Sequence, residues 1–251
     1  ALEFMLVWVA GGVVSLCGAL VYTELSGRFP ETGGEYRFLA RGYGAGTAFV
    51  FAWSRMTVIQ TGAIAAVAFV FGDYAQQVLP LGAAGGAIYA ALGVLALTML
   101  NLAGTPQSKA LQKVMSALLM VSLAAIALAG LLGPAAPAVP VKAAQGDLGL
   151  AMIFVLLTYG GWNEAAYIAG EVREPQRNMI RILVGGILAI SAIYLAVNVG
   201  YLAALGLAGM RESKAVAADL MRPIAGEAGA VVVALVVCVS ALTTMNAAIL
   251  T

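Results

Sequence analysis

The sequence has 251 residues, of which 62% are hydrophobic and only 10% are charged. Its mean hydropathy of +0.97 is far above that of soluble domains, in which about half of the residues are apolar, so we predict an integral membrane protein. The 13 basic and 12 acidic residues give a net charge of +1, with no basic surface that would indicate nucleic acid as a partner. Histidine is absent, which excludes imidazole metal sites and imidazole proton relays.

Apolar runs long enough to cross about 30 Å of hydrocarbon as helices can be placed seven times along the chain. They cover approximately residues 4–25, 45–72, 82–103, 114–133, 148–170, 182–207 and 228–251. The first run has no basic start and no small-residue cleavage site, so no cleavable signal peptide is predicted. Because the chain opens without a methionine and the last run ends on no polar flank, we expect a fragment of a longer protein.

The basic residues of the short loops are distributed unequally between the two sides of the membrane. One side holds Arg28, Arg37, Arg41, Lys109, Lys113, Arg173, Arg177 and Arg181. The other side holds only Lys142, Arg211, Lys214 and Arg222. Since lysine and arginine accumulate in cytoplasmic loops, the first group is predicted to be cytosolic and Ala1 to start outside. An outside start predicts one further helix before Ala1.

The glycines and one predicted outer loop allow two further structural predictions. Glycine numbers 30, and close helix packing is the default interpretation for Gly11, Gly12, Gly62, Gly93 and Gly185. The stretch 211–226 has charges on an apolar background. Two interpretations stay open for it: a short amphipathic helix over the outer face, or a solvated loop.

The fifth apolar run is interrupted at its middle by the sequence LTYGGWNE, residues 157–164. If the helix unwinds at Gly160 and Gly161, the preceding carbonyls form a partly negative end and the following N–H groups a partly positive one. Such a pair of half-helix ends suits a zwitterion, and discontinuous helices at the bilayer midplane are a general device of transporters. The alternative is that the two glycines serve only helix packing.

Three charged features inside or beside the spans leave alternatives open. Glu164 either marks an ion or substrate route or is simply hydrated in a vestibule. Arg55 is costly inside a span and either extends toward the cytosol or pairs with Glu24. In the turn GRFPETGGEYR, Pro30 and Gly33-Gly34 suit any tight turn. Its charges alternatively hold an inner gate by pairing with Glu171, Arg173, Glu174 and Arg177.

A resemblance to the amino acid-polyamine-organocation superfamily covers essentially the whole chain, closest to the L-type amino acid transporter branch and its bacterial relatives. Helices six and seven of that family resemble TYGGWNEAAYIAGEVREPQRN and the later NVGYLAALG. Its second helix, cytosolic turn and third helix resemble GALVYTELSGRFPETGGEYRFLARGYG. The join of helices four and five resembles LNLAGTPQSKALQKVMSALL, and helix eight resembles VSALTTMNAAILT.

This resemblance implies an all-α membrane protein with a partial LeuT-type inverted-repeat fold. The chain would supply about seven transmembrane helices, family helices two to eight, with a discontinuous helix at Gly160-Gly161. Residues 1–251 would form a single transmembrane domain, in which 1–133 is the remainder of the first inverted repeat and 148–251 the start of the second. The first helix and helices nine onward would be absent.

The resemblance also implies a substrate site on the interrupted helix. Carried over residue by residue, it consists of Leu157, Thr158, Tyr159, Gly160, Gly161, Trp162 and Asn163. The carbonyls of Leu157, Thr158 and Gly160 would bind the substrate ammonium, and Asn163 would lie beside the substrate side chain. Many relatives have an aromatic gate where this chain has Leu157, so a smaller lid over a roomier, less selective pocket is expected.

Coupling is predicted from a second departure. Many family members carry a lysine in helix five that acts as a tethered cation, and the corresponding residue here is Leu119. Lys113 cannot replace it, because six residues at about 100° each place it about 120° around the helix. Ser240, Thr243 and Thr244 offer hydroxyl oxygens for sodium, unless they bond the carbonyl one turn back. The candidate coupling residues are therefore Ser240, Thr243, Thr244, Leu119 and Glu164. Bound sodium or a coupled proton is the only cofactor considered.

The predicted function is a secondary transporter for small, neutral L-amino acids in the cell membrane, as cation-coupled symporter or as antiporter. An enzyme is not expected, because the three aspartates Asp73, Asp147 and Asp219 all lie in predicted outer loops. The alternatives are a non-transporting amino acid sensor on a permease scaffold and a polyamine or cationic amino acid permease. The expected partners are an amino acid and the lipid bilayer, and an accessory subunit stays open.

Overall fold

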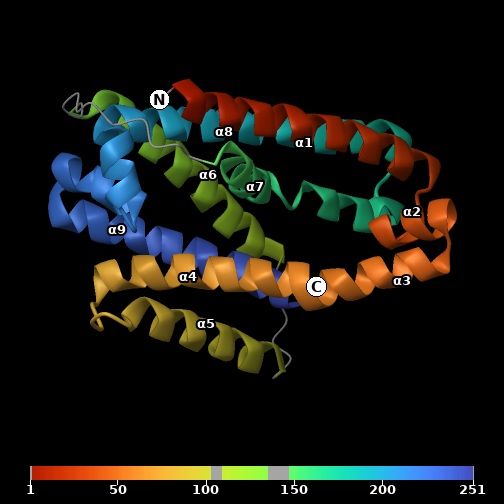
Figure 1. The fold of residues 1–251 in the computed structure, drawn as a ribbon, viewed down its shortest axis with the longest axis horizontal. Coiled ribbons are helices and arrows are strands. Elements are labelled where there is room, and N and C mark those ends of the chain that lie inside the picture. Colours follow the sequence, from red (N-terminus) through yellow and green to blue (C-terminus); the bar gives the residue numbers. More distant parts are fainter. Residues whose placement is uncertain (1, 103–108, 135–146, 251) are drawn as a thin grey trace. The chain divides into compact units, whose positions relative to one another are not determined.

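The computed structural model describes residues 2–102, 109–134 and 147–250 (Figure 1). Those residues form helices joined by short connections, with no strand among them, which confirms the predicted all-α class. The elements are α1 (Leu2–Arg28), α2 (Gly34–Tyr43), α3 (Ala45–Ser54), the π-helix η1 (Arg55–Ile59), α4 (Gln60–Val78), α5 (Gly85–Leu102), α6 (Lys109–Leu132), α7 (Leu148–Tyr159), the 3₁₀-helix η2 (Trp162–Glu171), α8 (Pro175–Glu212) and α9 (Val216–Leu250).

Within the described residues, five helical stretches are long and apolar enough to cross a membrane. They are Leu2–Arg28, Ala45–Val78, Gly85–Leu102, Arg177–Glu212 and Val216–Ile249. Two shorter apolar helices, Ala117–Leu132 and Leu148–Tyr159, fall on the fourth and fifth predicted runs. Large apolar side chains are exposed along these helices, as lipid-facing surfaces require. All seven predicted apolar runs therefore fall on apolar helices.

The chain divides into two compact units, and each is discontinuous in sequence. The first unit is Ala1–Met56 with Lys142–Ala196, and the second is Thr57–Val141 with Val197–Thr251. Each unit therefore combines an N-terminal segment with a segment from the C-terminal half. The assignment of 1–133 and 148–251 to two inverted repeats stays a prediction.

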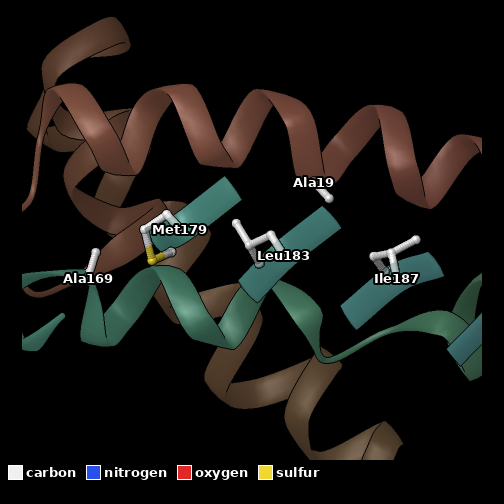
Figure 2. Close-up of a cluster of buried hydrophobic side chains, with 5 residues drawn as sticks. All are labelled: Ala19, Ala169, Met179, Leu183 and Ile187. Carbon is white, nitrogen blue, oxygen red and sulfur yellow. The ribbon is translucent and has the colours of Figure 1, made fainter. Parts of the chain in front are cut away.

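The core of the first unit lies where α1, η2 and α8 meet, as Figure 2 shows. Its buried side chains are Ala19, Ala169, Met179, Leu183 and Ile187. Two of the five are alanines, which contribute little volume, so the three helices approach closely. This packing places the 3₁₀-helix η2 directly against α1 and α8.

Close packing explains some of the glycines but not all of them. Those at positions 11, 12 and 93 lie against neighbouring side chains, as predicted. A Cβ atom at Gly11, for example, would lie 2.4 Å from Cγ1 of Val155. For Gly62 and Gly185 the prediction was wrong: in the described part of the chain, a Cβ at either position would meet nothing within 4 Å. Both glycines are exposed, so no helix among the described residues requires their small size.

In the second unit, α4 packs against both α5 and α9. A buried cluster of Ala68, Ala90 and Met245 joins these three helices. Gly72 lies so close to Gly86 that a Cβ there would be 2.1 Å from the Gly86 carbonyl oxygen. Small residues thus set the helix spacing in this unit as well.

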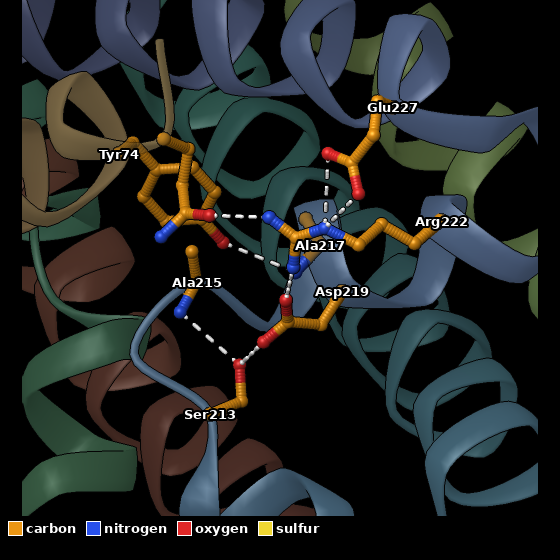
Figure 3. Close-up of polar contacts among 8 residues, drawn as sticks. Tyr74, Ser213, Ala215, Ala217, Asp219, Arg222 and Glu227 are labelled. Carbon is orange, nitrogen blue, oxygen red and sulfur yellow. Dashed lines mark hydrogen bonds and ion pairs between the residues drawn. The ribbon is translucent and has the colours of Figure 1, made fainter. Parts of the chain in front are cut away.

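Within the stretch 211–226, predicted to lie outside, residues 216–226 belong to a packed helix rather than to a solvated loop. The α9 element begins at Val216 and is broken at Gly226, whose φ of 64° lies in the left-handed region. Leu220 and the alanines at positions 215, 217 and 218 are buried. The segment is tied to α4, because Tyr74 Oη accepts the Ala217 N–H at 3.1 Å (Figure 3). The helix part of the amphipathic interpretation is therefore confirmed, whereas its place over the outer face stays a prediction.

Candidate functional site

The predicted break of the fifth apolar run is present. Helix α7 begins at Leu148, after its N-cap Asp147, whose Oδ1 accepts the N–H groups of Gly149 at 2.9 Å and Leu150 at 3.2 Å. It ends at Tyr159, and the chain then turns through Gly160 (ψ 166°) and Gly161 (φ 97°). A φ of 97° disfavours any residue with a Cβ, so the second glycine is required for this turn. A 3₁₀-helix, rather than a second α-helix, follows.

The carbonyls before the break are partly engaged. Leu157 O accepts the Gly160 N–H at 3.1 Å, which tightens the last turn of α7. Thr158 O accepts a hydrogen bond from Tyr194 Oη at 3.2 Å. Tyr194 belongs to α8 and was not singled out from the sequence. A hydroxyl therefore occupies one of the two lone-pair positions on a carbonyl that the resemblance assigns to the substrate ammonium.

The two aromatic residues of the predicted site face protein. Tyr159 is buried, with its ring centroid 6.1 Å from that of Trp8 and 5.3 Å from that of Tyr194. The ring of Trp162 meets that of Tyr22 edge to face at 5.1 Å. Both rings thus pack η2 and α7 onto α1 and α8. By contrast, the side chain of Leu157 is largely exposed, at 55%.

Asn163 belongs to a polar cluster that we call the Glu35 network. Its members are Tyr22, Glu35, Arg55, Asn163, Glu164 and Tyr167. Oε1 of Glu35 accepts hydrogen bonds from Tyr22 Oη at 2.6 Å and from Asn163 Nδ2 at 2.8 Å. Oε2 accepts from Arg55 Nη1 and from Tyr167 Oη, both at 2.8 Å. One carboxylate thus receives four donors from three different elements, α1, η1 and η2.

Arg55 links the two carboxylates of this network. Its Nη1 pairs with Glu35 and its Nη2 with Glu164, and its guanidinium carbon lies 4.9 Å from the centroid of the Tyr167 ring. The side chains of Arg55 and Glu35 are only 19% and 11% exposed, whereas that of Glu164 is 46% exposed. The interpretation of Glu164 as simply hydrated is therefore incomplete, because this carboxylate also pairs with an arginine.

One of the two alternatives for Arg55, the pair with Glu24, was wrong. The partners of this arginine are Glu35 and Glu164, and its extension toward the cytosol stays a prediction. Glu24 instead pairs with Arg28 one turn away on α1. The cost of an arginine inside a span correctly indicated a carboxylate partner. Glu35 is the partner because the turn at Gly33 (φ 116°) and Gly34 (φ 44°) directs α2 back toward the core.

The described charges of the turn 27–37 form other pairs than those that the gate hypothesis predicts. Glu31 pairs with Arg37 at 3.9 Å and with Arg41, both within the same turn and helix. The side chain of Glu171 lies outside the described residues. The turn still meets η2 through backbone, since a Cβ at Gly170 would lie 3.0 Å from the Pro30 carbonyl oxygen.

The predicted coupling residues of α6 and α9 lie in the second unit. Leu119 and Ser240 line an apolar cavity of about 390 Å³. Thr243 Oγ1 donates to Val239 O at 2.8 Å, and Thr244 Oγ1 donates to Ser240 O at 3.0 Å. Both threonine hydroxyls therefore bond the carbonyl one turn back, the second of the two interpretations. Among the described residues, no three acidic or cysteine side chains gather as a metal site would require.

The family model described as "Amino acid permease" matches residues 2–251. The chain belongs to this family. Among its relatives is the mouse b(0,+)-type amino acid transporter 1, 28% identical over 85% of the chain and 46% of the relative. The Serine/threonine exchanger SteT of Bacillus subtilis is 28% identical over 76% of the chain and 44% of the relative. The human Large neutral amino acids transporter small subunit 2 is 28% identical over 88% and 44%.

These comparisons confirm the resemblance to the superfamily. The permease chain spans less than half the length of the curated relatives it matches. All three relatives are named as transporters or exchangers rather than enzymes. Family membership and five membrane-length helices together identify a multi-pass protein of the plasma membrane.

Proposed function

We propose that this permease chain is part of a secondary transporter that moves small, neutral L-amino acids across the plasma membrane by alternating access. The observation that carries the proposal is the break at Gly160-Gly161, which separates the carbonyl end of α7 from the N–H end of η2. Opposed half-helix ends offer partial charges of both signs to one zwitterion. The named transport substrates of the relatives, amino acids in each case, support the same class.

The carbonyls of Leu157, Thr158 and Gly160 would receive the substrate ammonium. The Tyr194 hydroxyl that donates to Thr158 O would then share or yield this carbonyl when the ammonium arrives. The carbonyl would then accept a hydrogen bond from the tyrosine hydroxyl in the empty state and from the ammonium in the loaded state. This avoids an unpaired polar group in the membrane. Asn163 would lie beside the substrate side chain.

Charge balance favours a neutral substrate over a cationic one. Glu164 is the acidic residue nearest to the break in sequence, and its carboxylate pairs with Arg55. The second carboxylate close to the half-helix, Glu35, pairs with the same arginine. A cationic amino acid or polyamine would have to compete with this guanidinium for either carboxylate. We therefore propose neutral amino acids in preference to polyamines and cationic amino acids.

Exchange is the proposed mode of coupling. Leu119 offers no charge, and the hydroxyls of Thr243 and Thr244 already donate to backbone carbonyls. A sodium site at these residues would need their oxygens to turn toward the ion. Coupling through Ser240 or Glu164, to sodium or to a proton, is the outcome that would replace this proposal.

The test is transport by the full-length gene product reconstituted in liposomes. A thermal-shift screen of the twenty amino acids first selects the ligand, and uptake of that radiolabelled amino acid is then measured. We expect saturable uptake that requires an unlabelled amino acid inside the liposome and is unchanged when choline replaces sodium or when external pH varies. Sodium- or pH-dependent uptake would replace exchange with symport. Binding without uptake would identify a sensor, and preferential uptake of arginine or putrescine would overturn the neutral substrate.

A further inference from the structure

The Glu35 carboxylate is saturated with donors although it lies within a strongly apolar protein. Two hydrogen bonds reach each oxygen, from Tyr22, Asn163, Arg55 and Tyr167, at distances of 2.6–2.8 Å. Hydrogen bonds to a charged group contribute more than those between neutral groups, and a buried charge without partners is strongly unfavourable. This carboxylate therefore holds its four partners in defined positions.

Two of these contacts come from η2, the element that follows the break. Asn163 and Tyr167 are one turn apart on η2, and both donate to Glu35 of α2. Tyr22 connects the same carboxylate to α1. The half-helix that follows Gly161 is thus fastened at two points to a single side chain.

The contact with Glu35 also fixes which way the amide of Asn163 faces. A carboxylate accepts hydrogen bonds and repels another acceptor, so Nδ2 of Asn163 faces Glu35 and Oδ1 faces away from it. If residue 35 were neutral and able to donate, the amide would be free to turn over. Turning it over exchanges a donor for an acceptor on both sides of the side chain.

We infer that Glu35 is a positioning residue for the amino acid site: it holds the Asn163 amide in one orientation and fastens η2, the half-helix after the break, to α1 and α2. This inference rests on the proposed function for its consequence in transport. Its structural part, the fastening of η2, stands independently. Arg55 supports the arrangement by balancing the charge of Glu35.

The first experiment compares Glu35→Gln with Glu31→Gln in the full-length protein. Glu31 lies in the turn just before α2, is exposed and, among the described residues, pairs with Arg37 and Arg41 of α2, so its substitution is the matched control. We expect E35Q to raise KM for the preferred amino acid about tenfold with a much smaller change in maximal rate, whereas E31Q leaves both unchanged. In an Asn163→Ala background, E35Q should raise KM less than about twofold further, because its effect passes through Asn163. Full additivity would overturn the orienting role.

The second experiment needs no substrate. Ala169 of η2 is fully buried, so a cysteine there reacts with a membrane-permeant thiol reagent only when η2 moves. In a background with Cys17 and Cys238 replaced by alanine, we expect E35Q to speed modification of A169C about tenfold or more. A cysteine at Ala234 of α9, also fully buried but in the second unit, should stay protected. Unchanged protection at position 169 would overturn the fastening role.

The two control measurements distinguish unfolding of the whole protein, and failure of the proposed function, from loss of the contact between Glu35 and η2. If A234C also becomes reactive, E35Q has unfolded the protein, and the milder Glu35→Asp is used with the same two expectations. If the parent protein transports no amino acid, the proposed function fails, while the modification rates still decide whether Glu35 fastens η2.

Discussion

Each of the two units contains an arginine that bridges two carboxylates, yet the two arginines are built differently. Arg55 in the first unit joins Glu35 and Glu164, which are 20 and 109 residues away along the chain. Arg222 in the second unit joins Asp219 and Glu227, three and five residues away (Figure 3). The side chain of Arg55 is 19% exposed and that of Arg222 is 37% exposed. Burial and sequence separation make the first a tertiary clamp and the second a largely local tie.

The difference shows where an ion pair influences a membrane transporter. An exposed pair contributes little, because water and salt screen it. A buried pair adds little net stability when complete but is costly to break, since the remaining charge stays buried. Arg55 therefore constrains the broken helix strongly, whereas Arg222 mainly ties α9 together across its break at Gly226. Arg222 also donates to Gln77 of α4 at 2.6 Å, which ties α9 to α4.

The largest effect is expected from Arg55→Gln. This substitution leaves Glu35, with a side chain only 11% exposed, without its balancing charge. We expect a loss of about 3–5 kcal/mol in the free energy of unfolding. Thermal unfolding of the purified full-length protein in detergent measures it. A loss below about 1 kcal/mol would show that water reaches Glu35 and that the clamp does not exist.

A smaller loss is expected from Gly161→Ala, which tests the backbone that the Arg55 clamp holds. The φ of 97° at Gly161 strains any residue with a Cβ, at a cost of about 1–3 kcal/mol. Gly185→Ala is the matched control, because Gly185 lies in α8, where alanine is favourable and no described atom lies within 4 Å of the new Cβ. We expect G161A to lower the unfolding temperature and impair transport, and G185A to do neither. Equal behaviour of the two variants would contradict a fixed break.

Arg222→Gln tests the second arginine directly. Both of its carboxylate partners are more exposed than Glu35, at 30% for Asp219 and 77% for Glu227. We expect a loss of only about 1 kcal/mol in the free energy of unfolding, measured as for Arg55. The comparison depends on how much larger the loss of unfolding free energy is in R55Q than in R222Q. If R222Q matched R55Q, burial would not explain the difference between the two clusters.

The sequence predicts the helices and the break because these depend on local patterns. Long apolar runs have few alternatives in a bilayer, and Gly160-Gly161 with polar neighbours is a strong local signal. The Glu35 network was missed because its members come from four separate segments and Glu35 lies in a turn that looks ordinary. Arg55 was the available signal: an arginine in a span requires an acceptor, but sequence alone did not identify which one. Likewise, the orientation of Tyr194 toward Thr158 O depends on how α8 packs on α7.

The smallest effect is expected from Arg28→Gln, which sets the lower end of the comparison. Arg28 pairs with Glu24 at i and i+4 on α1, and the two side chains are 71% and 64% exposed. We expect a change of no more than about 0.5 kcal/mol in the free energy of unfolding, and no change in KM. Titrating salt from low to high concentration should remove even this difference, because an exposed pair is screened within a Debye length of about 10 Å at 0.1 M. The loss in R55Q should persist at high salt, since its pair is buried; a parallel decline of both would mean that water reaches Glu35 and Arg55.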